Sequence, residues 1–373
     1  MGDLIFPSSL VVLAQLLGER LNGPQAQAAE IDRPVVTLAL RRHYVGPLLY
    51  GTAVTGERSI ADDLLSELEQ SYRANVRRNA SALARLDQIK AAFAAHGINW
   101  MALKGVTQAT QLYTDPAWRE SSDIDILVTP NEFLRAIDTL VASGFIASNP
   151  PIPSIRFLRK PIWRAVRDVT LIARDDHRCA VELHRRLFFA SGKRAQALKF
   201  ATSEGTFKTP ALGPDLTFYL IAHGAASFWV RLKWLVDLVP LFAKLNDGEK
   251  FAILERAREA GAESAVAASL LLLHALFPFV ALGPLAPWVE HKRSERHVKQ
   301  RLQRYAEMIS LEHDWKRSPL DNALMALESS WMLFEAPSTR ARILMSAFPS
   351  SMARKIAATL SKSDRALTMS EAP

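Results

Sequence analysis

The sequence predicts an α+β protein that is mostly helical, with one small mixed sheet between N-terminal helices and a C-terminal helical region. Residues 1–97 and 201–335 are typical of helices, whereas residues 98–200 hold short apolar runs separated by turn residues. In this middle part, the order strand, helix, strand, helix, hairpin is typical of a small α/β unit. We therefore divide the chain after residues 97, 200 and 335, and we expect residues 336–373 to form a basic tail.

Length and composition are those of an ordinary globular protein. The chain has 373 residues, of which 49% are apolar and 23% are charged, and with only 16 glycines it is not collagen-like. Lys and Arg total 46 against 38 for Asp and Glu, so the net charge is +8. This excess favours anionic ligands, but it does not establish nucleic-acid binding.

Three features bear on the compartment. The single cysteine, Cys179, excludes an internal disulfide and a cysteine-based zinc site, which fits a reducing compartment. The N-terminus lacks the basic segment of a signal peptide. Residues 264–289 are free of Asp, Glu, Lys and Arg, but prolines interrupt them, and the unbroken part is too short to cross a bilayer core of about 30 Å. We therefore expect a cytoplasmic protein with no transmembrane segment.

The N-terminal region contains one long predicted helix. Ser59-Ile-Ala-Asp62 has the pattern of a capping box, and it predicts a helix from Ser59 to about His96. Gly97 supplies the C-terminal stop. Apolar residues at helical spacing give the helix one buried face, and we interpret the arginines opposite as a solvated face.

Short elements follow Gly97. They are, in order, a strand over 98–103, a turn at Lys104-Gly105, a helix over 106–113 and a strand over 123–128. A helix then begins with Thr129 as its cap, Glu132 closes the capping box, and the helix ends at Ser143-Gly144. Residues 148–154 are a predicted loop, and strands over 167–174 and 178–184 form a hairpin around the turn at 175–177. In the C-terminal region we expect helices over 214–225, 228–245, 249–260, 264–277, 293–310 and 320–335.

Two carboxylates on the second strand indicate a metal site. Asp123 and Asp125 are two residues apart, so both point to one face, while Ile124 and Ile126 point into a core. Two adjacent carboxylates repel each other, and a divalent cation with oxygen ligands relieves that repulsion. Mg²⁺ suits such a pair, with Mn²⁺ as the alternative.

A third carboxylate lies on the later hairpin. Glu182 and His184 share one face of their strand, and if this strand lies beside the Asp strand, Glu182 comes within about 5 Å of the two aspartates. Three acids on one sheet face can hold two metal ions about 3.5–4 Å apart. One ion would activate an acceptor hydroxyl, and the other would bind the nucleotide phosphates.

The turn at Lys104-Gly105 suggests a phosphate site. Glycine lets the backbone approach an anion, and the N–H groups of the helix that follows favour negative charge. Lys104 and Arg119 add positive charge, and we assign His184 to the same nucleotide site. Neither a dinucleotide-binding nor a P-loop glycine motif occurs. Each of these motifs alone is common on protein surfaces, so the metal-site interpretation depends on their order.

Five residues of the helical second half are further candidates for contact with nucleotide or acceptor: His223, Arg231, Lys233, Trp234 and Asp237. Arg231, Trp234 and Asp237 are spaced by three, which places them on one side of a helix. In the functional interpretation they face the cleft, and Trp234 stacks on a base. In the alternative, Asp237 pairs with a basic residue and Trp234 belongs to the core.

The order of these motifs resembles the nucleotidyltransferase fold of the DNA polymerase beta type, and more closely the family of uncharacterised nucleotidyltransferases. The resemblance covers roughly residues 60–280. The matching motifs are Leu103-Lys104-Gly105, Leu112-Tyr113, Arg119, residues 123–128, Gly144-Phe145, residues 181–184, His223, and Arg231-Leu-Lys-Trp234 with Asp237. The turn departs from the Gly-Ser or Gly-Gly of the wider superfamily, so its phosphate contacts cannot be transferred residue by residue.

The resemblance implies Mg²⁺-dependent transfer of a nucleoside monophosphate from an NTP, with ATP expected, to an acceptor hydroxyl or phosphate. Asp123, Asp125 and Glu182 would bind metal, and Glu182 would also act as base. Neighbouring genes for polysaccharides or lasso-type peptides in this family imply a biosynthetic or tailoring role with a saccharide, peptide or small-molecule acceptor.

Three alternatives remain open. They are a phosphoryl-transferring peptide-modifying enzyme on the same site, a non-catalytic nucleotide-binding regulatory module, and an enzyme acting on nucleic acid, which the charge permits but no aromatic-basic surface favours. The sequence identifies neither the acceptor nor the oligomeric state.

Overall fold

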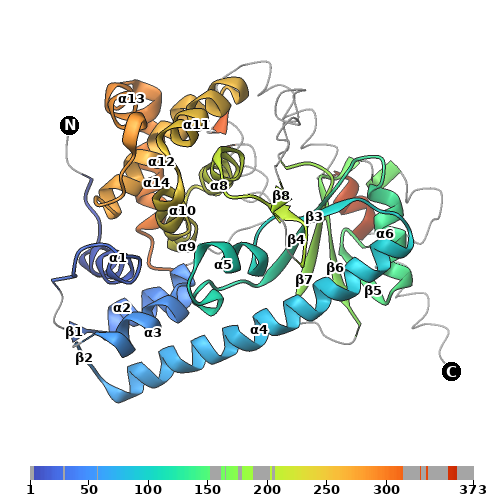
Figure 1. Ribbon diagram of the computed structural model, residues 1–373, viewed down its shortest axis with the longest axis horizontal. Coiled ribbons are helices and arrows are strands. Elements are labelled where there is room, and N and C mark those ends of the chain that lie inside the picture. Colours follow the sequence, from blue (N-terminus) through green and yellow to red (C-terminus); the bar gives the residue numbers. More distant parts are fainter. Residues whose placement is uncertain are drawn as a thin grey trace.

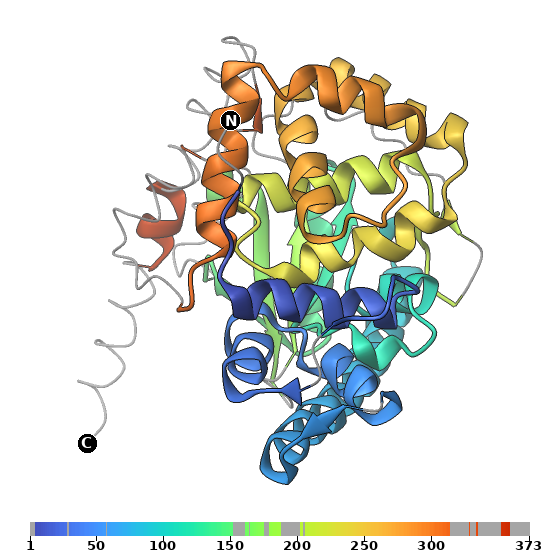
Figure 2. The same cartoon turned by 90° about the vertical axis from the view of Figure 1, so that its left-hand side faces the viewer.

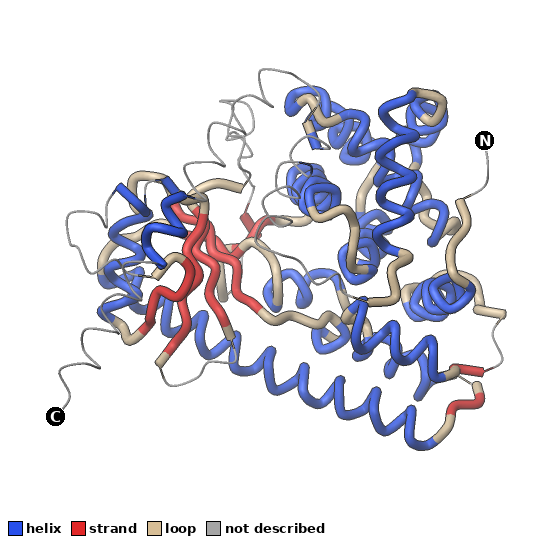
Figure 3. Tube along the Cα trace, turned by 180° about the vertical axis from the view of Figure 1, so that it is seen from behind, coloured by secondary structure: helices blue, strands red, loops and turns tan. Residues whose placement is uncertain are grey.

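The fold combines a helical body with a five-stranded sheet. A computed structural model describes residues 4–27, 30–56, 58–151, 161–163, 165–174, 179–187, 202–203, 206–313, 328, 333–334 and 352–358. The sheet lies at one end, the helices gather at the other, and the long helix α4 (Asp62–Ala95) runs along both (Figure 1). The same division is visible from behind, where the strands of the five-stranded sheet lie together at one end and β1 and β2 lie apart from them at the other (Figure 3). This confirms the predicted α+β class.

The sheet has the strand order β3-β4-β7-β6-β5. Its strands are β3 (Trp100–Ala102), β4 (Asp123–Val128), β5 (Phe145–Asn149), β6 (Asp168–Ala173) and β7 (Ala180–His184). β4 and β7 are parallel, and the other neighbours are antiparallel, so the sheet is mixed as predicted. The parallel pair places two strands that are far apart in sequence at the centre of the sheet.

β5 is a strand that the sequence analysis missed. Phe145 and Ala147 face the core, whereas Ile146, which points to the opposite face of this edge strand, is 43% exposed. The exposed isoleucine hides the alternation of apolar and polar residues on which strand prediction depends. The predicted loop at 148–154 therefore begins inside this strand, and residues 152–154 lie outside the described part.

The predicted start of α4 at Ser59 is wrong. Ser59 and Ile60 form β2, which pairs in parallel with β1 (Glu30–Ile31), so the chain is extended there. The helix begins at Asp62 with Ala61 as its N-cap, and no side chain caps it. Asp62 and Asp63 in the first turn instead complement the positive end of the helix dipole.

The C-terminal end of α4 agrees with the sequence analysis. The helix ends at Ala95, Gly97 has a φ of +59°, and the N–H of Ile98 donates to the carbonyl of Phe93. A glycine in the left-handed region is the common way to end a helix.

The helix that follows β4 also starts later than expected. α6 (Phe133–Ala142) has Glu132 as its N-cap, without a side-chain cap. Thr129 does contact Glu132, but its hydroxyl donates to the Glu132 carboxylate at 3.0 Å instead of capping the helix. A turn closed by Glu132 N–H and Thr129 C=O separates the strand from the helix.

The helical body combines N- and C-terminal segments. Its N-terminal elements are α1 (Ser8–Arg20), α2 (Arg33–Thr37), the π-helix η1 (Leu38–His43) and α3 (Gly46–Thr55), and from the middle of the chain α5 (Val106–Leu112) and the 3₁₀-helix η2 (Pro116–Trp118) join it. Its C-terminal elements are α8 (Pro214–Ala226), α9 (Leu232–Val236), α10 (Leu238–Lys244), α11 (Asp247–Ala260), α12 (Glu263–Leu276), η4 (Gly283–Leu285), α13 (Ala286–Lys292) and α14 (Arg296–Ile309). α1 lies between the other N-terminal helices and the C-terminal ones (Figure 2).

Two hydrophobic cores follow from this arrangement. One unites α1–α3 and the first turns of α4 with α8–α14, and the other joins the rest of α4 and α6 to the sheet. α4 therefore contributes to both cores, through Leu64 and Leu68 at one end and Leu86, Ile89 and Phe93 at the other. The division of the chain after residues 97, 200 and 335 stays a prediction.

The predicted helix over 228–245 is wrong, because the chain turns at Phe228 and Trp229. Both residues are fully buried with φ near +50°, and Trp229 Nε1 donates to Ser269 Oγ at 2.9 Å. The ring of Trp229 packs on Gly224, where a Cβ would lie 2.4 Å from the ring. α9 and α10 form the remainder as two short helices.

The other predicted C-terminal helices correspond to α8, α11, α12 and α14, whereas the helix at 320–335 lies almost wholly outside the described residues. Two further short strands, β8 (Thr202–Ser203) and β9 (Thr209–Pro210), form a separate ribbon. α12 is the apolar segment that the sequence singled out, and it is buried in the helical core. Within the described part of the chain, none of the helices combines the length and apolar character that crossing a membrane requires.

The revised helix starts predict different effects for two cap variants. Ser59→Ala should change the free energy of unfolding by less than about 0.5 kcal/mol, because Ser59 caps nothing. Asn246→Ala should cost about 1 kcal/mol, because Asn246 and Glu249 form a complete capping box on α11. Urea unfolding of the two variants measures these changes. An equal decrease in the free energy of unfolding for both variants would indicate that Ser59 does cap the helix.

Candidate functional site

The acidic residues of β4 and β7 meet because the two strands pair in parallel. In this register Asp125 lies directly opposite Glu182. Ile124 and Ile126 face the sheet core and are 2% and 0% exposed. Asp123 and Asp125, which alternate with them along the strand, therefore face the other side, as predicted. The expectation that Glu182 sits on the strand next to the aspartates is confirmed.

One group of side chains in the described residues could hold a metal ion: Asp125, Glu182 and His184, whose ligand atoms all lie within 4.8 Å of one another. His184 Nε2 is 3.0 Å from Asp125 Oδ1 and 3.5 Å from Glu182 Oε2. Carboxylate oxygens with one imidazole nitrogen are a donor set that divalent cations use. Asp123, which we expected as a ligand, lies two residues before Asp125 on the same strand face and outside this group.

Positive groups surround Asp125. Lys104 Nζ lies 3.3 Å from Asp125 Oδ2 and 3.5 Å from His223 Nε2. Burial raises the pKa of Asp125, but Lys104 and His184 outweigh it and hold that pKa well below its usual range. Burial and the neighbouring charge of Asp125 raise the pKa of Asp123. The two aspartates therefore differ in pKa, and Asp125 is the one whose anionic form the site stabilises more strongly.

His184 carries a proton in this arrangement. Burial lowers its pKa, but the hydrogen bonds to Asp125 and Glu182 outweigh burial and raise the pKa to about 9. The other ring nitrogen, Nδ1, lies 3.9 Å from Asp168 Oδ2 on β6. Asp168 is itself held by Arg167 at 2.7 Å. The imidazolium therefore has a carboxylate on each side.

Gly105 positions Lys104 beside these acids. Gly105 has φ +89° and ψ −137°, a conformation that side chains disfavour, and a Cβ there would lie 3.2 Å from the Asp123 carbonyl oxygen. Leu103, two residues before Gly105, is tied to the strand, since its N–H donates to the Asp125 carbonyl at 2.9 Å. The turn thus packs directly on the strand that carries the aspartates, which supports its predicted place in the site.

Arg119 and Asp237, two predicted contact residues, bind each other. Arg119 Nε and Nη2 donate to the Asp237 carboxylate at 2.9–3.1 Å, and Arg119 Nη1 donates to Ser121 Oγ at 2.8 Å. Tyr113 OH donates to the same carboxylate at 2.8 Å. Arg119 and Asp237 are 6% and 1% exposed. This is the pairing that the alternative interpretation expected of Asp237, and it joins the sheet region to the C-terminal helices.

The remaining predicted residues lie on α8 and α9. The His223 ring meets the Trp234 ring edge-on, with centroids 5.3 Å apart. Burial and Lys104 lower the pKa of His223 far below its usual value, so His223 is neutral. Burial and Arg119 lower the pKa of Lys233 to about 8. Arg231 stacks on the Tyr44 ring at 4.4 Å from its centroid, so it contacts the N-terminal helices.

Asp168 is a site residue that the sequence motifs did not indicate. It lies opposite His184 in the β6–β7 pair. A signal for it existed. A hairpin centred on residue 176, the middle of the predicted turn, pairs residue 168 with residue 184. Arg354 Nη2, from the C-terminal segment, donates to the Asp168 carbonyl at 3.0 Å, and no local pattern in the sequence indicates that contact.

The buried ion pair predicts a large loss of stability on removing one partner. Asp237→Ala should lower the free energy of unfolding by about 3–5 kcal/mol, because Arg119 would remain buried without its counter-charge. Glu69→Ala, which removes the exposed pair of Glu69 with Arg73, should cost less than about 1 kcal/mol. Chemical denaturation measures both, and similar losses would contradict the assignment of Arg119–Asp237 as a structural pair.

The raised pKa of His184 predicts that stability depends on pH. The folded-state pKa of about 9 exceeds the unfolded value of 6.5. The stabilisation is therefore fully present below pH 6.5 and is lost as the pH rises through about 9. Urea unfolding in EDTA should show a larger difference between wild type and His184→Gln at about pH 6 than at about pH 9.5. His96→Gln, at an exposed position, is the control, and an equal difference at both pH values for His184→Gln would refute the charged pair.

Comparison with known proteins agrees with this geometry. A family model described as "Uncharacterised nucleotidyltransferase" matches residues 29–278, more than half of the chain and all of the residues discussed above except Arg354. A search of curated proteins and a search of solved structures gave no match. The resemblance expected from the motifs is thereby confirmed. The chain belongs to the family of uncharacterised nucleotidyltransferases, and it is a transferase of that class.

Proposed function

We propose that the protein transfers a nucleoside monophosphate from an NTP, with ATP expected, to an acceptor hydroxyl or phosphate, using Mg²⁺ or, as the alternative, Mn²⁺. The observation that carries this proposal is the pairing of Asp125 with Glu182 on adjacent parallel strands, with Lys104 3.3 Å from Asp125. Acidic oxygens for a cation and an ammonium group for phosphate thus converge on one point.

The donor set fits a divalent cation. Asp125 and Glu182 supply oxygens, His184 supplies a nitrogen once it has lost its proton, and Asp123 is the further carboxylate on the same face. Lys104 and the protonated His184 neutralise Asp125 in the described structure. Because the buried Asp125 carboxylate stabilises two positive groups, we expect it to stabilise a bound cation as well. A bound divalent ion would supply Lewis-acid polarisation of the phosphoryl group and would lower the pKa of the attacking hydroxyl.

The protein residues then have defined roles in the transfer. The acceptor oxygen forms a bond to the α-phosphorus, and the bond from that phosphorus to the pyrophosphate oxygen breaks. Glu182, whose side chain is 36% exposed, is the base that takes the acceptor proton. Lys104, with the Gly105 turn and Lys233, provides positive charge for the leaving pyrophosphate.

The helical residues border this site. Trp234 and neutral His223 form an edge-on aromatic pair beside Lys104, and we assign them to contact with the nucleotide base or the acceptor. Arg119 and Asp237 satisfy each other, so we assign to them the positioning of β4 against α9 and α10. Arg231, stacked on Tyr44, supports the same junction.

The acceptor is a saccharide, a peptide or a small molecule in a biosynthetic or tailoring pathway, and this choice rests on the family resemblance alone. We favour a reducing, cytoplasmic location, because the sequence has one cysteine, Cys179, which is buried and can form no disulfide within the chain. The mass of the product separates nucleotidyl transfer from the phosphoryl transfer that an enzyme with the same site could perform.

Calorimetric titration with a non-hydrolysable ATP analogue tests the metal site. Wild type should bind it at least tenfold more tightly with Mg²⁺ than in EDTA, since the cation bridges protein and phosphates. Asp125→Asn and Glu182→Gln should lose this dependence on Mg²⁺. Asp138→Asn, an exposed carboxylate on α6, should keep it.

Two outcomes would contradict the proposal. One is binding that does not depend on Mg²⁺ in wild type. The other is a dependence that persists in Asp125→Asn. Overall affinity is a weaker readout, because Asp125→Asn leaves Lys104 and His184 unneutralised and free to attract phosphate without a cation.

A further inference from the structure

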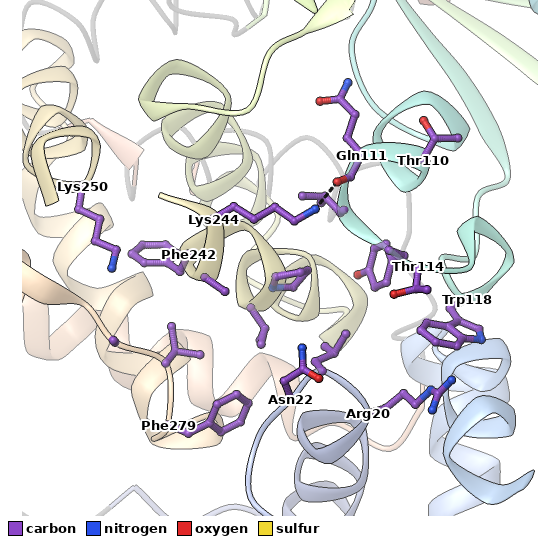
Figure 4. Close-up of a pocket in the computed structure, with 18 residues that line it drawn as sticks. Arg20, Asn22, Thr110, Gln111, Thr114, Trp118, Phe242, Lys244, Lys250 and Phe279 are labelled. Atoms are coloured by element: carbon purple, nitrogen blue, oxygen red, sulfur yellow. Dashed lines mark hydrogen bonds between the residues drawn. The ribbon is translucent and has the colours of Figure 1, made fainter. Parts of the chain in front are cut away.

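A second pocket lies at the other end of α5 from the acidic site. Its volume is about 840 Å³, and its walls come from the end of α1, the end of α5, η2, α10, the start of α11 and residues 279–281 (Figure 4). α5 starts beside Lys104 and ends in the pocket wall at Leu112. Seven helical residues span about 10 Å, so the pocket and the acidic site are separate.

The charges in the pocket wall are all positive. Arg20, Lys244 and Lys250 line it, and no Asp or Glu is among the lining residues. Lys250 and Arg20 lie at opposite sides of the pocket, with Lys244 between them (Figure 4). Such a wall favours an anionic ligand with more than one contact point.

Lys250 is the most informative of these residues. It is 7% exposed, yet its ammonium group makes no hydrogen bond or ion pair with any residue in the described ranges. The aliphatic stem of Lys250 is therefore packed in the wall, whereas its ammonium group keeps contact with solvent in the pocket. A ligand that enters the pocket can supply a partner that none of the described residues provides.

The other two cations are held in place by the wall. Arg20 stacks on the Trp118 ring at 4.1 Å from its centroid, and its buried Nε has no hydrogen-bond partner among the described residues. Lys244 donates to the carbonyl of Gln111 (Figure 4). Both positive groups are therefore pre-positioned, which reduces the entropy lost on binding.

The rest of the wall is aromatic and apolar. Phe242 lies beside Lys250, Phe279 lies nearer Asn22, and Trp118 borders the opposite side (Figure 4). Tyr113 also lines the pocket. Small-molecule sites combine such a lining with a few placed polar groups, and their volumes are about 300–1,000 Å³.

We propose that this pocket binds an organic anion that carries a flat apolar part, with the anionic group on Lys250 and Lys244 and the apolar part against Phe279. This ligand site is separate from the acidic site, and ligand binding there does not require the transferase reaction. Its recognition elements are charge and aromatic contact, because the wall offers no carboxylate to bind a cation.

The probe for this site is 8-anilinonaphthalene-1-sulfonate, an aromatic sulfonate that has both features. Fluorescence titration of the full chain should give saturable binding with one site, confirmed by calorimetric stoichiometry. Lys250→Met should raise the dissociation constant at least tenfold, because a charge-assisted contact is lost. Lys299→Met, which removes an exposed lysine on α14, should leave it unchanged.

A second variant guards against a change in folding. Ala243→Trp places a large side chain at an exposed position of the pocket wall, and it should block the probe as well. Thermal unfolding should show that Lys250→Met is about as stable as wild type, since Met keeps the apolar stem of the side chain and no ion pair within the described residues is lost. Unchanged probe affinity in both variants, or binding that does not saturate, would overturn the proposal.

Discussion

The parallel pairing of β4 with β7 is the constraint on which the acidic site depends. Parallel strands cannot be joined by a tight turn, so the chain must leave β4, form α6 and the β5 and β6 strands, and return. The register of the return decides which side chains meet. With Asp125 opposite Glu182, two acids share a face, and a slip of one residue would turn Glu182 into the core and Leu183 out of it. Leu183 and Val181 are fully buried, so the hydrophobic core enforces the register that the site requires.

Such a concentration of acids is stable only because positive groups are built in around it. Asp125 is 1% exposed, and burial of an uncompensated carboxylate is costly. Lys104 comes from the turn after β3, and His184 comes from the end of β7, so the compensation arises from the same sheet. Gly105 favours this arrangement, because at its φ of +89° a side chain is strained and a Cβ would lie 3.2 Å from the Asp123 carbonyl. The same positive groups that stabilise the acids are those that would meet phosphate.

Local patterns predicted the acidic strand to the residue, and contacts across the chain explain what they missed. Asp123–Ile126 alternates in polarity with period two, Leu127 and Val128 continue the apolar run, and the acids needed only a neighbouring strand to become a site. The break in the helix at Trp229 depends on Gly224 and on Ser269, forty residues later, so helical spacing could not reveal it. Arg119 and Asp237 were each singled out, but 118 residues separate them, and their mutual pairing required the structure.

The pairing of Arg119 with Asp237 also connects the two sites. Tyr113 is among the residues that line the second pocket, and its hydroxyl donates to Asp237. Asp237 holds Arg119, and Arg119 donates to Ser121, two residues before Asp123 on the acidic strand. Each of these bonds is buried, so displacing Tyr113 would leave polar groups without partners, which costs about 1–3 kcal/mol per group. The wall that faces a ligand in the second pocket is therefore stiff, and it is attached through a short chain of hydrogen bonds to the strand that carries the acids.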